Sequence, residues 1–148
     1  MPKKNQIKID ISKLDIVEIL PKTQIINNFP ELNNIDAKIK YNIQLNPLYN
    51  FDSNIIKIEL GVLIEWEDKG QDLRIGEFAY DFIYEYDKLS DITDSNGNIT
   101  PEIFLTCSNI SYSTLRGIIH AKSATTCLEK ALLPIVTGSE LMQGLYNT

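Results

Sequence analysis

The sequence has few of the residues from which metal sites and covalent catalytic sites are built. It contains one histidine, His120, and two cysteines, Cys107 and Cys127, which are well separated along the chain. Three such residues do not supply the ligand spacing of a zinc site, and no nucleophile elbow, P-loop or dinucleotide-binding fingerprint is present. We therefore expect no enzymatic activity, no cofactor and no metal. His120 is interpreted as a surface or helix-end residue, and the cysteines as reduced, partly buried thiols.

Positive charge and long apolar runs are also scarce. The chain has 14 Lys and Arg against 20 Asp and Glu, and its net charge is −6. Because an acidic chain repels phosphates, nucleic acid and an anionic membrane are not expected as partners. No apolar run approaches the ~20 residues that span a bilayer, and the start MPKKNQIKID lacks the apolar segment of a secretory signal. These features predict a cytoplasmic protein without membrane insertion.

The composition is otherwise that of an ordinary globular domain. Of the 148 residues, 43% are hydrophobic and 23% charged, which suits one domain with a sizeable core. No internal repeat, low-complexity tract or interdomain linker is recognisable in the sequence. A single domain over residues 1–148 is therefore predicted.

Alternating apolar and polar side chains predict four β-strands. The expected strands cover residues 7–17, 39–45, 56–66 and 78–86. A bulge or bend is expected at Ser12 and Lys13, and Pro21 is expected to end the first strand. The segment EDKGQD, residues 67–72, predicts a hairpin between the third and fourth strands. Alternation this regular indicates an antiparallel sheet with one covered face.

The segment after the first strand is unusually apolar for a connection. Residues 21–36, PKTQIINNFPELNNID, combine turn-forming residues with Ile25, Ile26, Phe29, Leu32 and Ile35. Loops this long are usually functional or packed on themselves. The apolar side chains here and in residues 128–136 predict either a satellite core or a groove open to apolar segments of another chain.

The second half of the chain has a helical pattern. Thr100 suits an N-cap and Pro101 the first helical position, which predicts a short helix through Cys107. A second helix is expected from Ser111 to about residue 125. Glycine costs ~1 kcal/mol relative to alanine within a helix, so Gly117 is expected to mark close packing against the sheet.

A last helix is predicted from the capping-box pair Thr137 and Glu140. The predicted fold class is therefore α+β, with a four-stranded antiparallel sheet followed by two or three C-terminal helices packed on one face.

Short motifs in this second half resemble those of a known family. Thr114, Leu115 and Arg116 match the family's Y-A-R in its long helix, and Thr126 matches the threonine that closes that helix. LLPIV, residues 132–136, matches an L-A-P-V-N connector, and SELM, residues 139–142, matches the F-D-A-L-F that starts the last helix. With the order of the elements, these motifs resemble the SecB family of protein-export chaperones. Gly117, in place of the usual glutamate, and SATT, in place of R-G-T-F-P, indicate a divergent SecB-like member.

The resemblance implies a Greek-key sheet, a homo-oligomer (dimer or tetramer) and apolar grooves that bind unfolded polypeptide clients without ATP. It also implies transfer of clients to a translocation ATPase. Matched by position, the client-binding candidates are Ile25, Ile26, Phe29 and Leu32 in the loop, Tyr41 and Ile43 on the second strand, and Leu128, Leu132 and Leu133 near the connector.

Carboxylates opposite the aromatic face of the sheet form a second candidate surface. The residues are Glu59, Glu65, Asp81 and Glu85. The simplest interpretation is a solvated sheet face, and the resemblance implies the alternative of an acidic docking surface for the ATPase.

The leading functional hypothesis is an ATP-independent SecB-like holdase, including a role in protein export. The alternatives are a dedicated chaperone of one partner, such as a toxin–antitoxin pair, and a non-chaperone scaffold or adaptor with the same fold.

Overall fold

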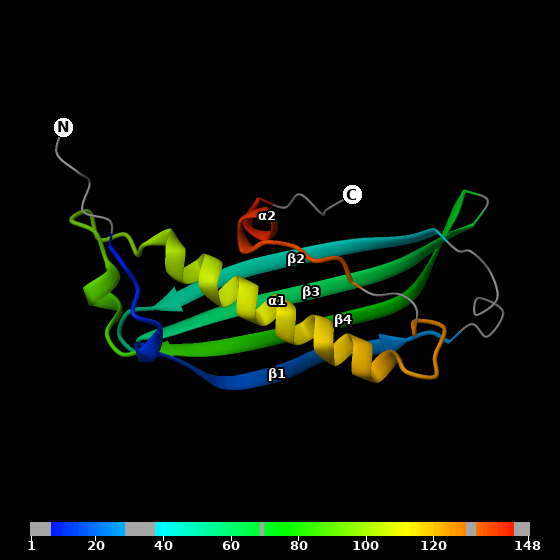
Figure 1. The fold of residues 1–148 in the computed structure, drawn as a ribbon, viewed down its shortest axis with the longest axis horizontal. Helices are drawn as coiled ribbons and strands as arrows, with labels where there is room; N and C mark the ends of the chain where they lie inside the picture. The colour runs from blue at the N-terminus through cyan, green and yellow to red at the C-terminus, as the bar shows by residue number, and fades with distance from the viewer. Residues whose placement is uncertain (1–6, 29–37, 69, 130–132, 144–148) are drawn as a thin grey trace.

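The computed structural model describes residues 7–28, 38–68, 70–129 and 133–143. The elements, in chain order, are η1 (Ile11–Lys13), β1 (Leu14–Ile26), β2 (Lys38–Asn50), β3 (Ile55–Asp68), β4 (Gln71–Tyr86), η3 (Leu89–Ile92), α1 (Pro101–Ser123) and α2 (Gly138–Met142). Figure 1 shows a long sheet with α1 lying obliquely across one of its faces. The predicted α+β class is confirmed.

The four strands form one antiparallel sheet in the order β1-β4-β3-β2. Strands β2, β3 and β4 follow one another as hairpins. The first strand of the chain, β1, lies beside the last, β4, which gives a Greek-key arrangement. The predicted hairpin between β3 and β4 is confirmed, with Asp68 opposite Gln71.

The predicted bounds of the first strand are wrong. Residues 7–10 form no strand, and the Asp10 side chain accepts hydrogen bonds from Ser12, which caps the short helix η1. β1 then passes through Pro21, opposite Tyr80, with register shifts on either side. A proline is tolerated because an edge strand bonds to a neighbour on one side alone. For the same reason β2, the other edge, continues through Pro47 instead of ending near residue 45.

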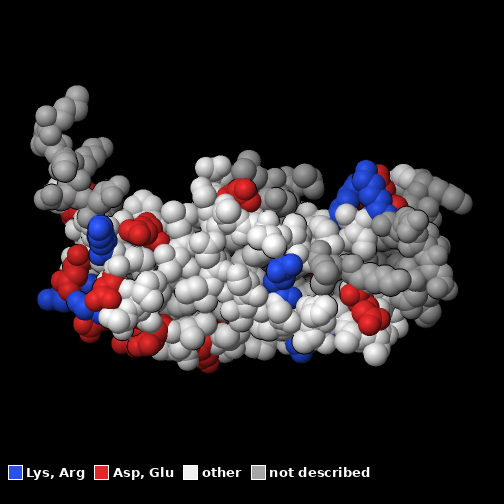
Figure 2. Space-filling model, viewed as in Figure 1, with Lys and Arg blue, Asp and Glu red and all other residues white. Residues whose placement is uncertain are grey.

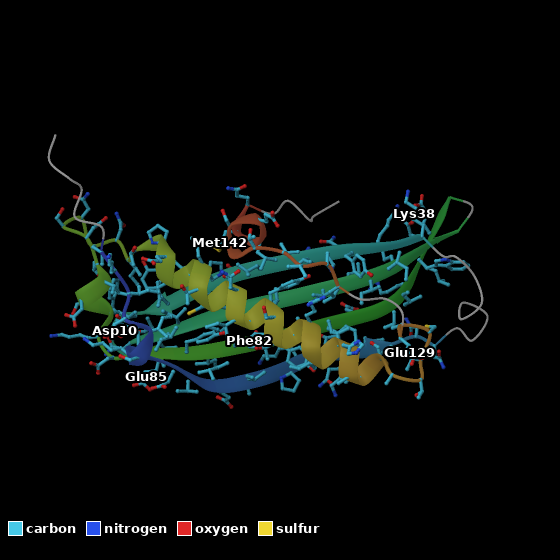
Figure 3. The ribbon with its side chains drawn as sticks, viewed as in Figure 1. Asp10, Lys38, Phe82, Glu85, Glu129 and Met142 are labelled. Atoms are coloured by element: carbon cyan, nitrogen blue, oxygen red, sulfur yellow. The ribbon has the colours of Figure 1, made fainter. Side chains whose placement is uncertain are left out.

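The core lies between the sheet and α1. Alternate residues of β3 and β4 face the helix and are buried, and Figure 3 shows Phe82 beneath α1. The helix contributes the buried side chains Ile103, Cys107, Leu115 and Ile119. At the centre, the Tyr84 hydroxyl lies 2.7 Å from Ser111 Oγ and donates to the Cys107 carbonyl at 3.2 Å. Burial of each large apolar side chain contributes roughly 1.5–3 kcal/mol.

One long helix replaces the two that were predicted between residues 101 and 125. The predicted start is confirmed in position, because Thr100 is the N-cap residue and Pro101 begins α1, but the Thr100 side chain makes no capping hydrogen bond. The polar residues Ser108 and Ser111 do not interrupt α1: both are buried, and Ser111 bonds to Tyr84. The prediction for Gly117 is wrong, since this residue is exposed and a Cβ there would meet no atom within 4 Å.

The second helix, α2, docks on α1 at a glycine. The predicted capping box is confirmed: Thr137 Oγ1 accepts from the Glu140 amide, and Glu140 Oε2 accepts from the Thr137 amide. A Cβ on Gly138 would lie 2.7 Å from the Leu105 carbonyl oxygen and 2.9 Å from Asn109 Oδ1. The missing side chain therefore lets α2 approach the backbone of α1.

Candidate functional site

The two faces of the sheet differ in what covers them. One face carries α1, α2 and the connector, a name we use for residues 133–136 between the helices. No described helix covers the other face, which we call the open face. Figure 2 shows the helix-covered side, where charged side chains gather toward the two ends and the middle is largely uncharged. An apolar client would contact this middle region without desolvating many charges.

The client-binding candidates fall into three groups in the structure. Ile25, Ile26 and Tyr41 are exposed or half-buried, and burial raises the pKa of Tyr41. By register, Ile25 lies opposite Glu77 on the open face. Ile43, Leu128 and Leu133 belong to the buried core. Three further candidates, Phe29, Leu32 and Leu132, lie outside the described residues. The described candidates therefore do not form one exposed surface, and their role in client binding stays a prediction.

The end of β1 and the turn after α1 are joined by hydrogen bonds. The Cys127 amide donates to Asn28 Oδ1 at 3.0 Å, and Cys127 Sγ donates to the Asn27 carbonyl at 3.4 Å. Asn27 is itself bonded to β4 through Arg74 and Ile75. Asn27 and Asn28, in the predicted apolar connection 21–36, thus lie beside Cys127, which precedes the apolar stretch 128–136.

Leu128 lies in the same turn and packs into the core. A Cβ on Gly76 of β4 would lie 2.9 Å from Leu128 Cδ1, so the glycine provides the space that Leu128 fills. This contact explains why a residue predicted to face a client is buried in the chain itself.

The connector is held against α1 by two side chains. Arg116 Nε donates to the Leu133 carbonyl at 2.8 Å, and the Tyr112 hydroxyl donates to the Pro134 carbonyl at 2.5 Å. Leu133 and Val136 are buried, whereas Ile135 between them is 83% exposed. The sequence marks Arg116 as part of a motif but does not predict this contact. The spacing of Tyr112 and Arg116, one helical turn apart, was the available signal.

The open face carries both signs of charge. Of the predicted acidic residues, Asp81 is buried between Lys22 and Lys57, at 3.5 and 3.7 Å. Glu59 lies 3.6 Å from Lys57 and accepts a hydrogen bond from Asn46. Glu65 and Glu85 form no ion pair with a described residue. Half of the candidate acidic surface is thus neutralised within the chain, and its role as a docking surface stays a prediction.

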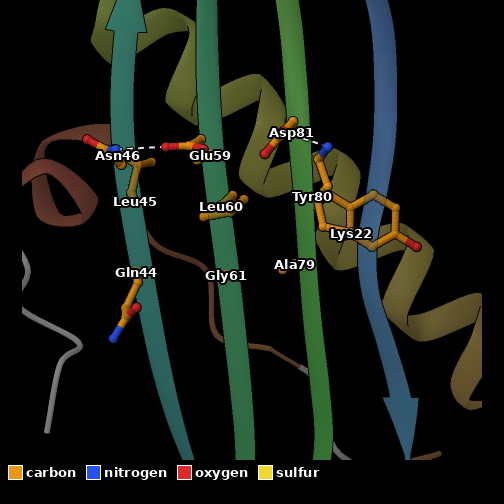
Figure 4. Close-up of a pocket in the computed structure, with 10 residues that line it drawn as sticks. All are labelled: Lys22, Gln44, Leu45, Asn46, Glu59, Leu60, Gly61, Ala79, Tyr80 and Asp81. Carbon is orange, nitrogen blue, oxygen red and sulfur yellow. Dashed lines mark hydrogen bonds and ion pairs between the residues drawn. The ribbon is translucent and has the colours of Figure 1, made fainter.

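A shallow trough crosses the open face. Gln44, Gly61, Ala79 and Thr23 are lateral neighbours on the four strands, and the small residues Gly61 and Ala79 form its floor (Figure 4). A cavity of about 390 Å³ lies on one side of this row, next to Asp81 and Glu59. The Lys22–Asp81 and Asn46–Glu59 pairs form its rim.

The candidates for catalysis and metal binding remain dispersed. In the part of the chain that the structure describes, no three His, Cys, Asp or Glu residues group to hold a metal. Cys107 and Cys127 are buried free thiols, and burial raises the pKa of Cys107 to about 12. His120 is exposed in the last turn of α1. Across these same described ranges, no helix is both long and apolar enough to cross a bilayer.

Exposed apolar side chains on β1 were not predicted as a surface. Ile16, Val17 and Ile19 are all exposed, and they flank the first register shift of the strand. The sequence signal was the slip in alternation after Ile16, which the bulge explains because an extra residue turns the side chains that follow.

Together, the Greek-key sheet, the long helix across one face and the short docked helix define an α+β fold of the SecB-like class. The particular likeness is to a Mycobacterium tuberculosis SecB-like chaperone, solved in complex with a ChAD peptide from the HigA1 antitoxin. The two chains share 12% identity over 86% of this chain and 89% of the other, with a TM-score of 0.56. This likeness shows the fold.

A second solved structure, of a Streptococcus agalactiae protein of unknown function, covers 84% of this chain and 94% of its own at 9% identity. Its TM-score of 0.36 is too low to support a conclusion. No protein-family model matches the sequence, and no curated protein matches it.

Proposed function

We propose that this protein is an ATP-independent SecB-like chaperone, a holdase that binds unfolded or partly folded polypeptides on its helix-covered side. The observation that carries the proposal is the SecB-like fold, shared with a chaperone that was solved with a peptide bound. The large exposed apolar side chain of Ile110 on α1 supports it.

The energetics of such contacts favour broad specificity. Each exposed large apolar side chain contributes at most about 1.5–3 kcal/mol when a client covers it. One such contact holds a client weakly, whereas several contacts along an extended client give avidity. Discrimination among sequences stays low, because apolar contacts of this kind distinguish clients poorly.

The proposal includes four further elements taken from the sequence. The chain is one domain, acts in the cytoplasm and forms a homo-oligomer, a dimer or tetramer. A translocation ATPase docks on the open face near Glu65 and Glu85, the predicted carboxylates that no described cation neutralises. Exposed Ile16, Val17 and Ile19 on the edge strand β1 support self-association.

A dedicated chaperone is the second candidate function. The M. tuberculosis SecB-like chaperone was solved with an antitoxin peptide, which favours a single antitoxin-like partner over the broad set of clients that export requires. A scaffold with a closed surface is the remaining alternative, and the experiment below separates it from both chaperone functions.

The test is light scattering from an unfolded, aggregating protein with and without the chain in subunit excess. The variant Ile110→Asp places charge on an exposed position, so its folding should be unaffected. The matched control is Leu48→Asp, because Leu48 is as exposed as Ile110 (42% against 39%) but projects from the open face.

A holdase suppresses scattering, and suppression is reduced in Ile110→Asp and kept in the control. No suppression at any ratio would refute the general holdase and leave the dedicated chaperone or the scaffold. Titration of the protein with a peptide from an antitoxin encoded beside its gene would then separate those two functions: binding supports the dedicated chaperone, and no binding supports the scaffold.

A further inference from the structure

The connector has the features of a bound peptide rather than of a turn. Residues 133–136 form neither helix nor strand, and Figure 1 shows them as an elongated stretch passing between α1 and β2. Leu133 precedes Pro134, which disfavours helical backbone at Leu133. Buried side chains alternate with the exposed Ile135.

The backbone of this stretch is bound by side chains of α1. Consecutive carbonyls, those of Leu133 and Pro134, accept hydrogen bonds from Arg116 and Tyr112. Within the described ranges, no backbone–backbone hydrogen bond involves residues 133–136. Two side-chain donors and the burial of Leu133 and Val136 are thus contacts that hold the segment in place.

These contacts do not depend on the connector's own sequence. A carbonyl is present in every residue of any polypeptide, and the space filled by Leu133 and Val136 accepts apolar side chains of similar volume. An extended apolar segment of another chain would form the same two hydrogen bonds and bury a similar area.

We propose that the connector occupies the client site, and that an extended apolar client segment binds by displacing residues 133–136. Arg116 and Tyr112 then donate to consecutive client carbonyls, and client side chains replace Leu133 and Val136. This inference rests on the proposed function and specifies its site, its binding mode and the residues that recognise the client.

The neighbouring segments allow such an exchange without global unfolding. On one side the Cys127 turn is bonded to Asn27 and Asn28. On the other side α2 is fixed by its capping box and by the close approach of Gly138 to α1. Local opening between two fixed points is the kind of sub-global event that folded proteins undergo.

The test uses a fluorescent peptide with the sequence of residues 128–138, LEKALLPIVTG, as a client that competes with the connector. Leu133→Ala weakens the connector but leaves the site intact, so the peptide should bind at least ten-fold tighter than to the wild type. Leu89→Ala is the matched control: Leu89 is also fully buried, but it lies in η3, and its loss should leave peptide affinity unchanged.

Arg116→Met in the Leu133→Ala background tests the carbonyl contact. Loss of a charged donor should weaken peptide binding about ten-fold relative to Leu133→Ala alone. If Leu133→Ala does not fold, Val136→Ala, a smaller deletion in the same segment, replaces it as the variant with a weakened connector. Circular dichroism checks the fold of each variant.

The inference is overturned if Leu133→Ala and Val136→Ala bind the peptide no more tightly than Leu89→Ala. It is also overturned if Arg116→Met has no effect on peptide affinity. If the protein suppresses aggregation but gives either of these results, the holdase function is retained and the connector is not its client site. Tight peptide binding without suppression would support the site and refute the holdase.

Discussion

Two glycines in helices should respond in opposite directions to the same substitution. A Cβ added at Gly117 of α1 would have no atom within 4 Å, whereas one added at Gly138 of α2 would meet the Leu105 carbonyl oxygen at 2.7 Å. Gly117→Ala removes the helix penalty of glycine and should raise the free energy of unfolding by about 1 kcal/mol. Gly138→Ala should lower it by about 1–3 kcal/mol, because the added methyl forces α2 away from α1.

The opposite signs of the two changes in unfolding free energy follow from the surroundings of each glycine rather than from helix propensity. Both glycines lie within helices, so propensity and unfolded-chain entropy favour alanine at each. The atom that opposes alanine at Gly138 is a backbone oxygen of α1, which cannot rotate away as a side chain would. The cost is therefore a shift of α2 and partial exposure of Leu141, which is buried in the wild type.

Urea unfolding, followed by fluorescence of the single tryptophan, Trp66, and by circular dichroism, measures both changes. With a slope of about 2 kcal/mol/M, a change of 1 kcal/mol moves the midpoint by about 0.5 M. Equal slopes in the three proteins are required for the comparison. If both variants are more stable than the wild type, α2 does not contact α1 as described, and the end of the connector is not fixed there.

Two further outcomes are expected. Burial raises the pKa of Cys107 from its usual 9.0 to about 12, and burial, opposed by the hydrogen bond to Ser111, raises that of Tyr84 from 10.0 to about 12. The unfolded chain therefore loses these protons at lower pH than the folded chain, so the free energy of unfolding should fall as pH rises from about 9 to 12. Cys107→Ala should make the urea midpoint decline less steeply with pH. A decline as steep as that of the wild type would contradict this. Val17→Asp, on the exposed part of β1, should reduce the mass measured by light scattering after size exclusion to that of the 16.8 kDa monomer, and an oligomer of unchanged mass would exclude β1 from the interface.

The sheet was predictable because its central strands follow a simple period. Residues of β3 and β4 alternate without interruption between a buried and an open face over most of their length, so strand type, hairpin and covered face could be predicted. The edge strands were harder, because Pro21 and Pro47 end a strand in local reasoning but are tolerated at a sheet edge. Local signals do not distinguish an edge strand from a central one.

The candidate site was less predictable than the fold. Leu128 and Leu133 were recognised as part of the apolar stretch 128–136, but the sequence did not indicate that the chain buries them itself. Leu128 depends on space beside Gly76, which is distant in sequence. The contact of Arg116 with the Leu133 carbonyl also depends on tertiary packing, so residue type and spacing could mark the residues but not their partners.

The prolines of the outer strands bear on the proposed function as a holdase. An open sheet edge is a template on which a sticky, extended polypeptide can add strand after strand. Here each outer strand has a residue without an amide hydrogen, Pro21 in β1 and Pro47 in β2, and β1 also carries two register shifts. Main-chain pairing of another extended chain with either edge is thereby confined to short stretches, so the proposed client would not be expected to extend the sheet as a further strand.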